Sequence, residues 1–193
     1  IVCFWCKWKN KTTLSKYDDL IENNNKRIKI LEETAQSIYQ EWFVKYNFPW
    51  SENIKMIDSG NDDFGMIPEE WEVGSILNID YIRFIRENIK VFEWEKVYYA
   101  TADIDWISIT WKWELFDFKS KPSRAQKEPI LNSVWFARMI ETFKVLWFTK
   151  SNEENSNNSI LSSWMVWFEA EELVFPFLYI TINSKDFHSL KNS

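Results

Sequence analysis

Glycine, histidine and cysteine are scarce in this sequence: its 193 residues include three Gly, one His and two Cys. Phosphate-cradling loops need closely spaced glycines, and no such motif is present. A single histidine, His188, is far more often a surface or core residue than a catalyst. Cys3 and Cys6 have no second ligand pair that would complete a zinc site. Two cysteines cannot build a disulfide framework either, so we expect a reducing, cytoplasmic setting.

Long apolar runs are absent as well. No stretch approaches the roughly 20 residues that a membrane helix needs, and no signal-peptide pattern is present, so we expect no membrane association. Carboxylates are plentiful, but no pair is singled out by its context, and we predict no catalytic residue. The sequence begins with Ile1, and we expect that its true start is missing. A composition of 46% hydrophobic and 27% charged residues is that of a globular protein.

Tryptophan, in contrast, is in excess, with 13 residues. Trp42, Trp71 and Trp135 stand where large apolar residues belong. The other ten are Trp5, Trp8, Trp50, Trp94, Trp106, Trp111, Trp113, Trp147, Trp164 and Trp167. Most of the ten stand in turn-like contexts, where a positive φ is often required and Gly adopts it freely. Glycine at all ten would restore the usual content of roughly 7%. We hypothesise that these positions are glycine in the working protein, for example through a UGA codon that some bacterial codes read as Gly. A genuinely Trp-rich fold is the alternative.

The first part of the chain carries a heptad pattern from Leu14 onward, which predicts a long helix that packs along another helix. One row consists of Leu14, Ile21, Ile28, Ala35 and Trp42, and a second row, three residues later, of Tyr17, Leu31 and Ile38. Only Asn24 interrupts the second row. Ser15 is a plausible start signal and Pro49 a stop signal, so we predict a coiled-coil-type helix over residues 14–48, with residues 1–13 unassigned. Such a rod is on the order of 50 Å long and needs a partner helix to bury its stripe.

The net charge of −6 comes from one segment of the chain. Seven acids and one base lie between Glu52 and Glu72, and the remainder of the chain is neutral. Gly60, Gly65 and Pro68 fall in the same stretch. We therefore predict an acidic linker over residues 49–66.

Residues 67–193 are predicted to form a mixed α+β domain, which gives the whole chain an α+β fold class. The β-branched and aromatic runs Val97–Thr101 and Ile107–Thr110 indicate strands. Pro176 favours a helix after it, with proline in the first turn. The run Val134–Ala137 is ambiguous in type but is predicted to build the core.

A short basic segment, Lys119–Lys127, is the best candidate for a ligand-binding site in this domain. Its four cations are separated by Ser, Pro and Gln. Lys and Arg contact phosphates or guanine, and Gln pairs with adenine. A solvated loop is the more common explanation of such a segment taken alone.

Four stretches together resemble the specificity subunits of Type I restriction-modification systems. LSKYDDLIENNNKRIKILEETAQSIYQEWFVKYNFP (residues 14–49), followed by FGMIPEEWEV (64–73), is similar to the central conserved helix of that family and the start of a target-recognition domain. PSRAQKEPILNSVWFARM (122–139) and ILSSWMVWFEA (160–170) are similar to segments of one class of those domains. In ILSSWMVWFEA, Trp164 and Trp167 stand where the family has glycine.

The resemblance implies a non-catalytic subunit that recognises double-stranded DNA. In the family, two recognition domains each read half of a split target, and paired helices hold them apart. The helices dock methyltransferase subunits, which bind S-adenosylmethionine, and a restriction/translocase subunit joins for cleavage; no cofactor is expected on this chain. We predict that the DNA-facing residues are Lys119, Lys121, Ser123, Arg124, Gln126 and Lys127 and that the helix-packing seam consists of the two heptad rows.

The sequence departs from the family pattern because it has one recognition domain and ends before a second conserved helix. We expect either a fragment of a two-domain subunit, with its recognition domain incomplete at the C-terminal end, or a half-subunit that forms a homodimer through the long helix. Two other functions stay open. A carbohydrate-binding module would use exposed Trp as stacking platforms, and a coiled-coil adaptor would use the helix alone.

Overall fold

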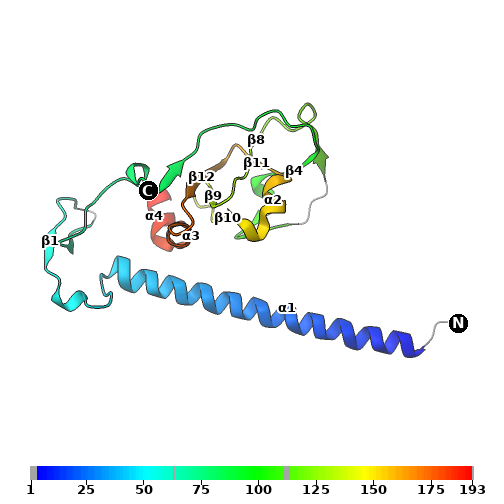
Figure 1. Cartoon of the computed structure of the whole chain (residues 1–193), viewed down its shortest axis with the longest axis horizontal. Helices are drawn as coiled ribbons and strands as arrows, with labels where there is room; N and C mark the ends of the chain where they lie inside the picture. Colours follow the sequence, from blue (N-terminus) through cyan, green and yellow to red (C-terminus); the bar gives the residue numbers. More distant parts are fainter. Residues whose placement is uncertain (1–3, 63, 111–113, 193) are drawn as a thin grey trace. The chain divides into compact units, whose positions relative to one another are not determined.

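The computed structural model describes residues 4–62, 64–110 and 114–192, and side chains from residue 14 onward (Figure 1). The chain divides into two units. The first comprises Ile1–Asp58 and Phe64–Glu70, and the second comprises Ser59–Asp63 and Trp71–Ser193. A long helix dominates the first unit and several small sheets form the second, so the α+β prediction is confirmed.

Helix α1 spans Phe4–Tyr39 and continues as a π-helical turn, η1, over Gln40–Val44. It begins well before Leu14, so the prediction of a start near Ser15 was wrong. The reason is that no Pro or Gly precedes Pro49, and nothing in the residues before Ser15 prevents them from extending the helix. Trp5 and Trp8 fall within α1, and their side chains lie outside the described part of the chain.

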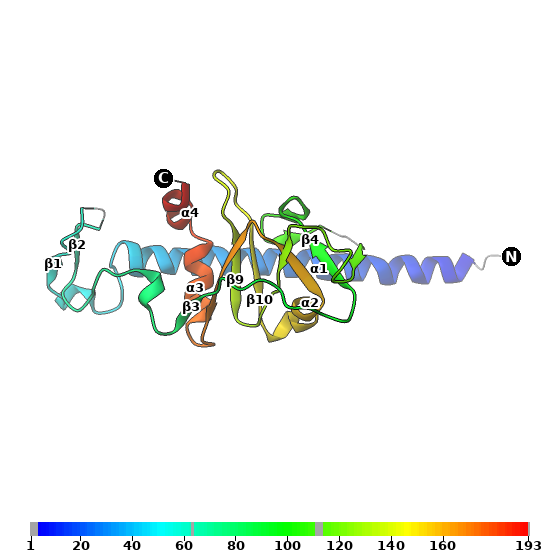
Figure 2. The same ribbon diagram turned by 90° about the horizontal axis from the view of Figure 1, so that it is seen from above.

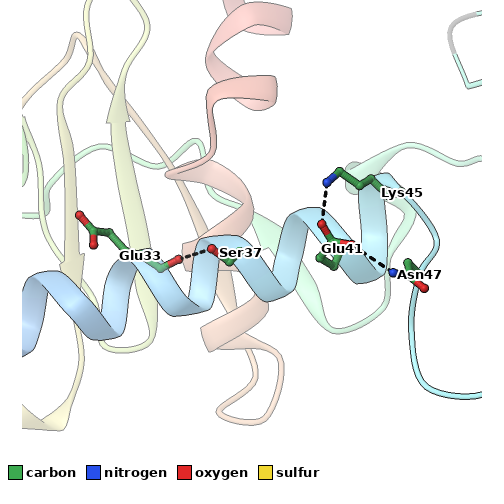
Figure 3. A network of polar contacts seen from close by, with 5 residues as sticks. All are labelled: Glu33, Ser37, Glu41, Lys45 and Asn47. Atoms are coloured by element: carbon green, nitrogen blue, oxygen red, sulfur yellow. Dashed lines mark hydrogen bonds and ion pairs between the residues drawn. The ribbon is translucent and has the colours of Figure 1, made fainter.

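The helix ends before Pro49 is reached, so Pro49 is not the stop. Lys45 N–H donates to the Gln40 carbonyl (2.9 Å), which is the wide spacing of a π turn. Tyr46 then adopts a left-handed backbone with φ of 57°, a common way to end a helix. The Glu41 carboxylate accepts hydrogen bonds from Lys45 Nζ (2.6 Å) and Asn47 Nδ2 (3.2 Å) (Figure 3). These bonds, from Lys45 first and then Asn47, hold the pKa of Glu41 below its ordinary value.

Residues 49–66, expected as an acidic linker, contain regular structure. A 3-10 turn, η2, covers Ser51–Asn53, and strand β1 (Met56–Asp58) pairs antiparallel with β2 (Met66–Pro68). The Lys55–Glu69 ion pair (3.0 Å) closes the open end of this hairpin. Asp58 and Asp62 therefore belong to a hairpin, so this part of the expected linker is structured.

The second unit contains two four-stranded sheets. The first sheet has the order β10-β9-β12-β3 and is entirely antiparallel. The second has the order β7-β4-β11-β8, and its β4–β11 pair is parallel. The strands are β3 Ile82–Phe84, β4 Lys96–Tyr99, β7 Leu115–Phe116, β8 Ala125–Lys127, β9 Ser133–Ala137, β10 Val145–Phe148, β11 Ser159–Ser162 and β12 Met165–Ala170. A separate hairpin pairs β5 (Ile104–Asp105) with β6 (Ser108–Ile109).

The helices of the second unit are α2 Glu153–Asn157, α3 Phe175–Ile182 and α4 Lys185–Asn192 (Figures 1 and 2). Its 3-10 turns are η3 Ile76–Asn78, η4 Thr101–Asp103 and η5 Lys150–Asn152.

Strand β9 lies at the centre of the domain and is buried on both faces. Val134 and Phe136 pack with Leu178 of α3, whereas Trp135 packs with Leu161 of β11 on the opposite face. This alternation follows from the two-residue period of a strand. The domain is thus layered as helix, first sheet and second sheet. The helix after Pro176 and a strand at Val97–Thr101 are confirmed by α3 and β4, and the predicted run Ile107–Thr110 contains β6.

Candidate nucleic-acid interface

The basic segment Lys119–Lys127 leads from a tight turn into the edge strand of the second sheet. Asp117 shapes the turn, since its carboxylate accepts the backbone N–H of Lys119 (2.9 Å) and Ser120 (2.6 Å). Hydrogen bonds from Ser120 are the main reason that the pKa of Asp117 is lowered. Strand β8 follows and pairs antiparallel with β11. The segment is therefore held by backbone hydrogen bonds at both ends.

Three of the six predicted DNA-facing residues are exposed: Lys119, Ser123 and Arg124. Arg124 makes no ion pair with any described residue. Its guanidinium instead lies over the Trp164 ring, 5.8 Å from the ring centroid. These three side chains are available to a ligand in solvent.

The other three make hydrogen bonds within the domain. Lys121 Nζ donates to the Ala125 carbonyl (2.7 Å), and Gln126 Nε2 donates to the Ser123 carbonyl (2.7 Å). Lys127 Nζ donates to the carbonyls of Arg86 (3.0 Å) and Glu87 (3.2 Å) and to Asn88 Oδ1 (2.9 Å). The six residues belong to one nine-residue segment, but three are exposed and three hold the domain together.

Burial lowers the pKa of Lys127, and the positive charge of Arg138 lowers it further, while the carboxylate of Glu87 raises it. Arg138 is thus a second cation that acts electrostatically on Lys127. Arg138 is exposed, and its guanidinium lies 4.9 Å from the centroid of the same Trp164 ring that Arg124 covers. Sequence reasoning missed Arg138 because it follows directly on the apolar run of β9, which was interpreted as core.

The predicted helix seam is exposed over most of its length. Exposed fractions range from 39% at Trp42 to 68% at Leu31, and Ala35 is half-buried. Apolar side chains that remain this accessible along one helix are typical of a surface that pairs with another helix. Such a pairing is a prediction that the single chain does not test.

Among the residues that the structure describes, no group of three or more His, Cys, Asp or Glu is arranged to hold a metal ion. Within that same part of the chain, no helix is both long and apolar enough to cross a membrane. Cys3, Trp111, Lys112 and Trp113 lie outside the described residues, and so does the side chain of Cys6.

Comparison with known proteins gives one informative match. Over 72 residues the chain is 36% identical to the Type I restriction enzyme MjaIX specificity subunit of Methanocaldococcus jannaschii. The match covers 36% of this chain and 16% of that protein, so it supports a relationship to specificity subunits over a limited part of both. No protein-family model matches the chain. No solved structure matches it.

Proposed function

We propose that this chain is a non-catalytic DNA-recognition subunit of a Type I restriction-modification complex. The observation that carries the proposal is the sequence similarity to the MjaIX specificity subunit, a protein whose name states this role. The exposed cations of the second unit support it, because Lys119 and Arg124 can contact phosphates or base edges.

The first unit supplies the features that an assembly subunit needs. A 36-residue α-helix is about 54 Å long at 1.5 Å per residue, which is about one and a half turns of B-DNA at roughly 34 Å each. In the proposed complex this helix sets the separation of two recognition domains on a bipartite target. Its exposed seam pairs with a second helix, from another copy of the chain or from the remainder of a longer subunit. Methyltransferase subunits, with S-adenosylmethionine, and a restriction/translocase subunit supply the chemistry.

The decisive experiment is co-expression with a methyltransferase subunit of a Type I system, followed by methylome sequencing of the host DNA. We expect methylation at one bipartite sequence that is lost when this chain is omitted. Binding of the chain to that sequence in a gel-shift assay, with weaker binding to a scrambled duplex, checks the DNA-recognition role directly. Unchanged methylation without the chain contradicts the proposal.

A coiled-coil adaptor is the second candidate, and the exposed seam favours it. Under that function the second unit is dispensable. Charge-removing substitutions at Lys119 and Arg124 then leave every measured activity unchanged, whereas a recognition subunit loses DNA binding. A carbohydrate-binding module is distinguished by glycan-array binding without DNA binding.

A further inference from the structure

The two-residue turn Ser163–Trp164 connects β11 of the second sheet to β12 of the first. Hydrogen bonds hold this turn on both sides. Ser163 N–H donates to the Arg124 carbonyl (2.8 Å), and Arg138 N–H donates to the Trp164 carbonyl (3.2 Å). The backbones of Arg124 and Arg138 are therefore fixed on opposite sides of the same short turn, where the two sheets meet.

Both arginine side chains lie against the one aromatic side chain of this turn. Their guanidinium carbons lie 5.8 Å (Arg124) and 4.9 Å (Arg138) from the centroid of one indole ring, that of Trp164. Neither guanidinium is paired with a carboxylate of any residue that the structure describes. Two cations that share one aromatic neighbour and have no counter-ion among the described residues can be bridged by an anion, and guanidinium groups match the geometry of a phosphate.

We propose that Arg124 and Arg138 together bind one phosphate of the DNA backbone across the Ser163–Trp164 turn, and that this site opens when residue 164 is small. The inference rests on the proposed function for the identity of the ligand. It adds Arg138 to the interface and assigns Arg124 to phosphate binding rather than to base reading. The indole of Trp164 contacts both guanidinium groups, so it takes up space beside them that the phosphate would need. With glycine at position 164 the turn keeps its backbone hydrogen bonds while the side-chain obstruction is removed.

Duplex DNA binding of the full chain, measured from 50 to 300 mM salt, tests the site. The variants are Trp164→Gly and, in that background, Arg124→Ala, Arg138→Ala and the double substitution. We expect Trp164→Gly to tighten binding several-fold, and each arginine substitution to weaken it by about tenfold at low salt. The double variant should lower the slope of log K against log salt by about one, because one phosphate is lost, whereas two separate phosphate contacts would lower it by about two. Lys150→Ala, an exposed cation on η5, is the matched control and should change little.

A second measurement separates this site from the proposed function. Pyrophosphate at millimolar concentration should raise the melting temperature of the Trp164→Gly protein and leave the double arginine variant unchanged. If DNA binds but ignores both arginines, and pyrophosphate has no effect, the phosphate site is overturned while DNA recognition stands. If pyrophosphate stabilises through the arginines but no duplex binds, the site stands and the proposed function fails. Weaker DNA binding by Trp164→Gly would also contradict the proposal, because it would mean that the indole itself contacts DNA.

Discussion

At the scale of single residues, the backbone angles of two tryptophans are informative about the excess of tryptophan in the sequence. Trp50 and Trp106 both adopt left-handed conformations, with φ of 69° and 51°, and both side chains are exposed. This combination is strained for a bulky side chain and free of strain for glycine. The two positions therefore support the hypothesis that glycine stands there in the working protein. Trp167 differs, because it is buried in the middle of β12 and stacks on Trp135 with 4.2 Å between ring centroids.

Trp50→Gly and Trp106→Gly should each stabilise the protein by about 1 kcal/mol, since the left-handed backbone no longer opposes a side chain. Urea denaturation followed by circular dichroism measures the change. Trp94→Gly is the matched control, because Trp94 is exposed but has no positive φ and gains nothing from glycine. Loss of stability in the Trp50 and Trp106 variants would speak for genuine tryptophans.

His188 gives the fold a pH dependence. Its ring packs on Phe143, with 3.8 Å between ring centroids, and burial, assisted by the positive charge of Lys191, lowers its pKa to about 4. An unfolded His has a pKa of about 6.5, so as the pH falls the unfolded chain binds the proton first. The stability that neutral His188 confers is complete above about pH 6.5 and is lost between pH 6.5 and 4, by at most about 3 kcal/mol.

Chemical denaturation at several pH values between 4 and 7 checks this prediction. The comparison is with His188→Leu, which keeps an apolar side chain of similar size but cannot titrate. We expect the difference in unfolding free energy between the two proteins to vary over this window. A constant difference would show that His188 titrates normally in the folded state.

Lys127 and Lys119 have different roles despite their proximity in sequence. Lys127 ties β8 to the Arg86–Asn88 segment through three hydrogen bonds, whereas the side chain of Lys119 is exposed. Lys127→Met should therefore lower the free energy of unfolding by about 1–2 kcal/mol. Lys119→Ala should leave stability unchanged and weaken binding to all DNA sequences alike, with a smaller salt slope. Equal stability of the two variants would contradict the structural role of Lys127.

At the scale of elements, the sequence patterns predicted which helices and strands are present better than they predicted where each one begins and ends. The heptad rows indicated the long helix, because periodicity survives over many turns. The start of the helix was missed because Ser15 looks like an N-terminal cap although it lies inside the helix. The end was missed because Tyr46 stops the helix with a left-handed backbone, which no sequence signal marks. The run Val134–Ala137 stayed ambiguous because an uninterrupted apolar run has no period that separates a buried strand from a helix. Arg138 was missed because it follows directly on this apolar run, and because Arg124, which contacts the same Trp164 ring, precedes a different strand, β8.

The helix seam leads to a prediction about self-association. Ile28→Glu should disrupt helix pairing, because a charge in the seam would be buried between two helices. Ile30→Glu is the matched control, since Ile30 is an exposed apolar residue on the same helix but outside the heptad rows. Sedimentation velocity over a range of concentrations should show association for the parent and for Ile30→Glu, and a shift toward monomer for Ile28→Glu. An identical response of both variants would mean that the heptad rows do not define the contact.

At the scale of the whole molecule, negative charge is concentrated on and around one hairpin. The segment from Glu52 to Glu72 accounts for the full net charge of −6. A polyanion is repelled by such a segment at low ionic strength, and the repulsion is screened over about 8 Å at physiological salt. Asp58→Asn with Asp62→Asn should therefore tighten DNA binding a few-fold at 20 mM salt and have little effect at 200 mM. Fluorescence anisotropy at both salt concentrations provides the measurement, and weaker binding of the variant would show that the acids are needed for binding.

The connection between β11 and β12 has only two residues, yet it passes the chain from one sheet to the other. A link this short cannot absorb an added or deleted residue without shifting the pairing of one strand, which would turn buried side chains toward solvent. This surface can therefore change in evolution by substitution of side chains, but not by insertion or deletion in the connection. Under the proposed function, relatives with different target sequences should vary in residue identity here, while the spacing between Arg124, the turn and Arg138 stays constant.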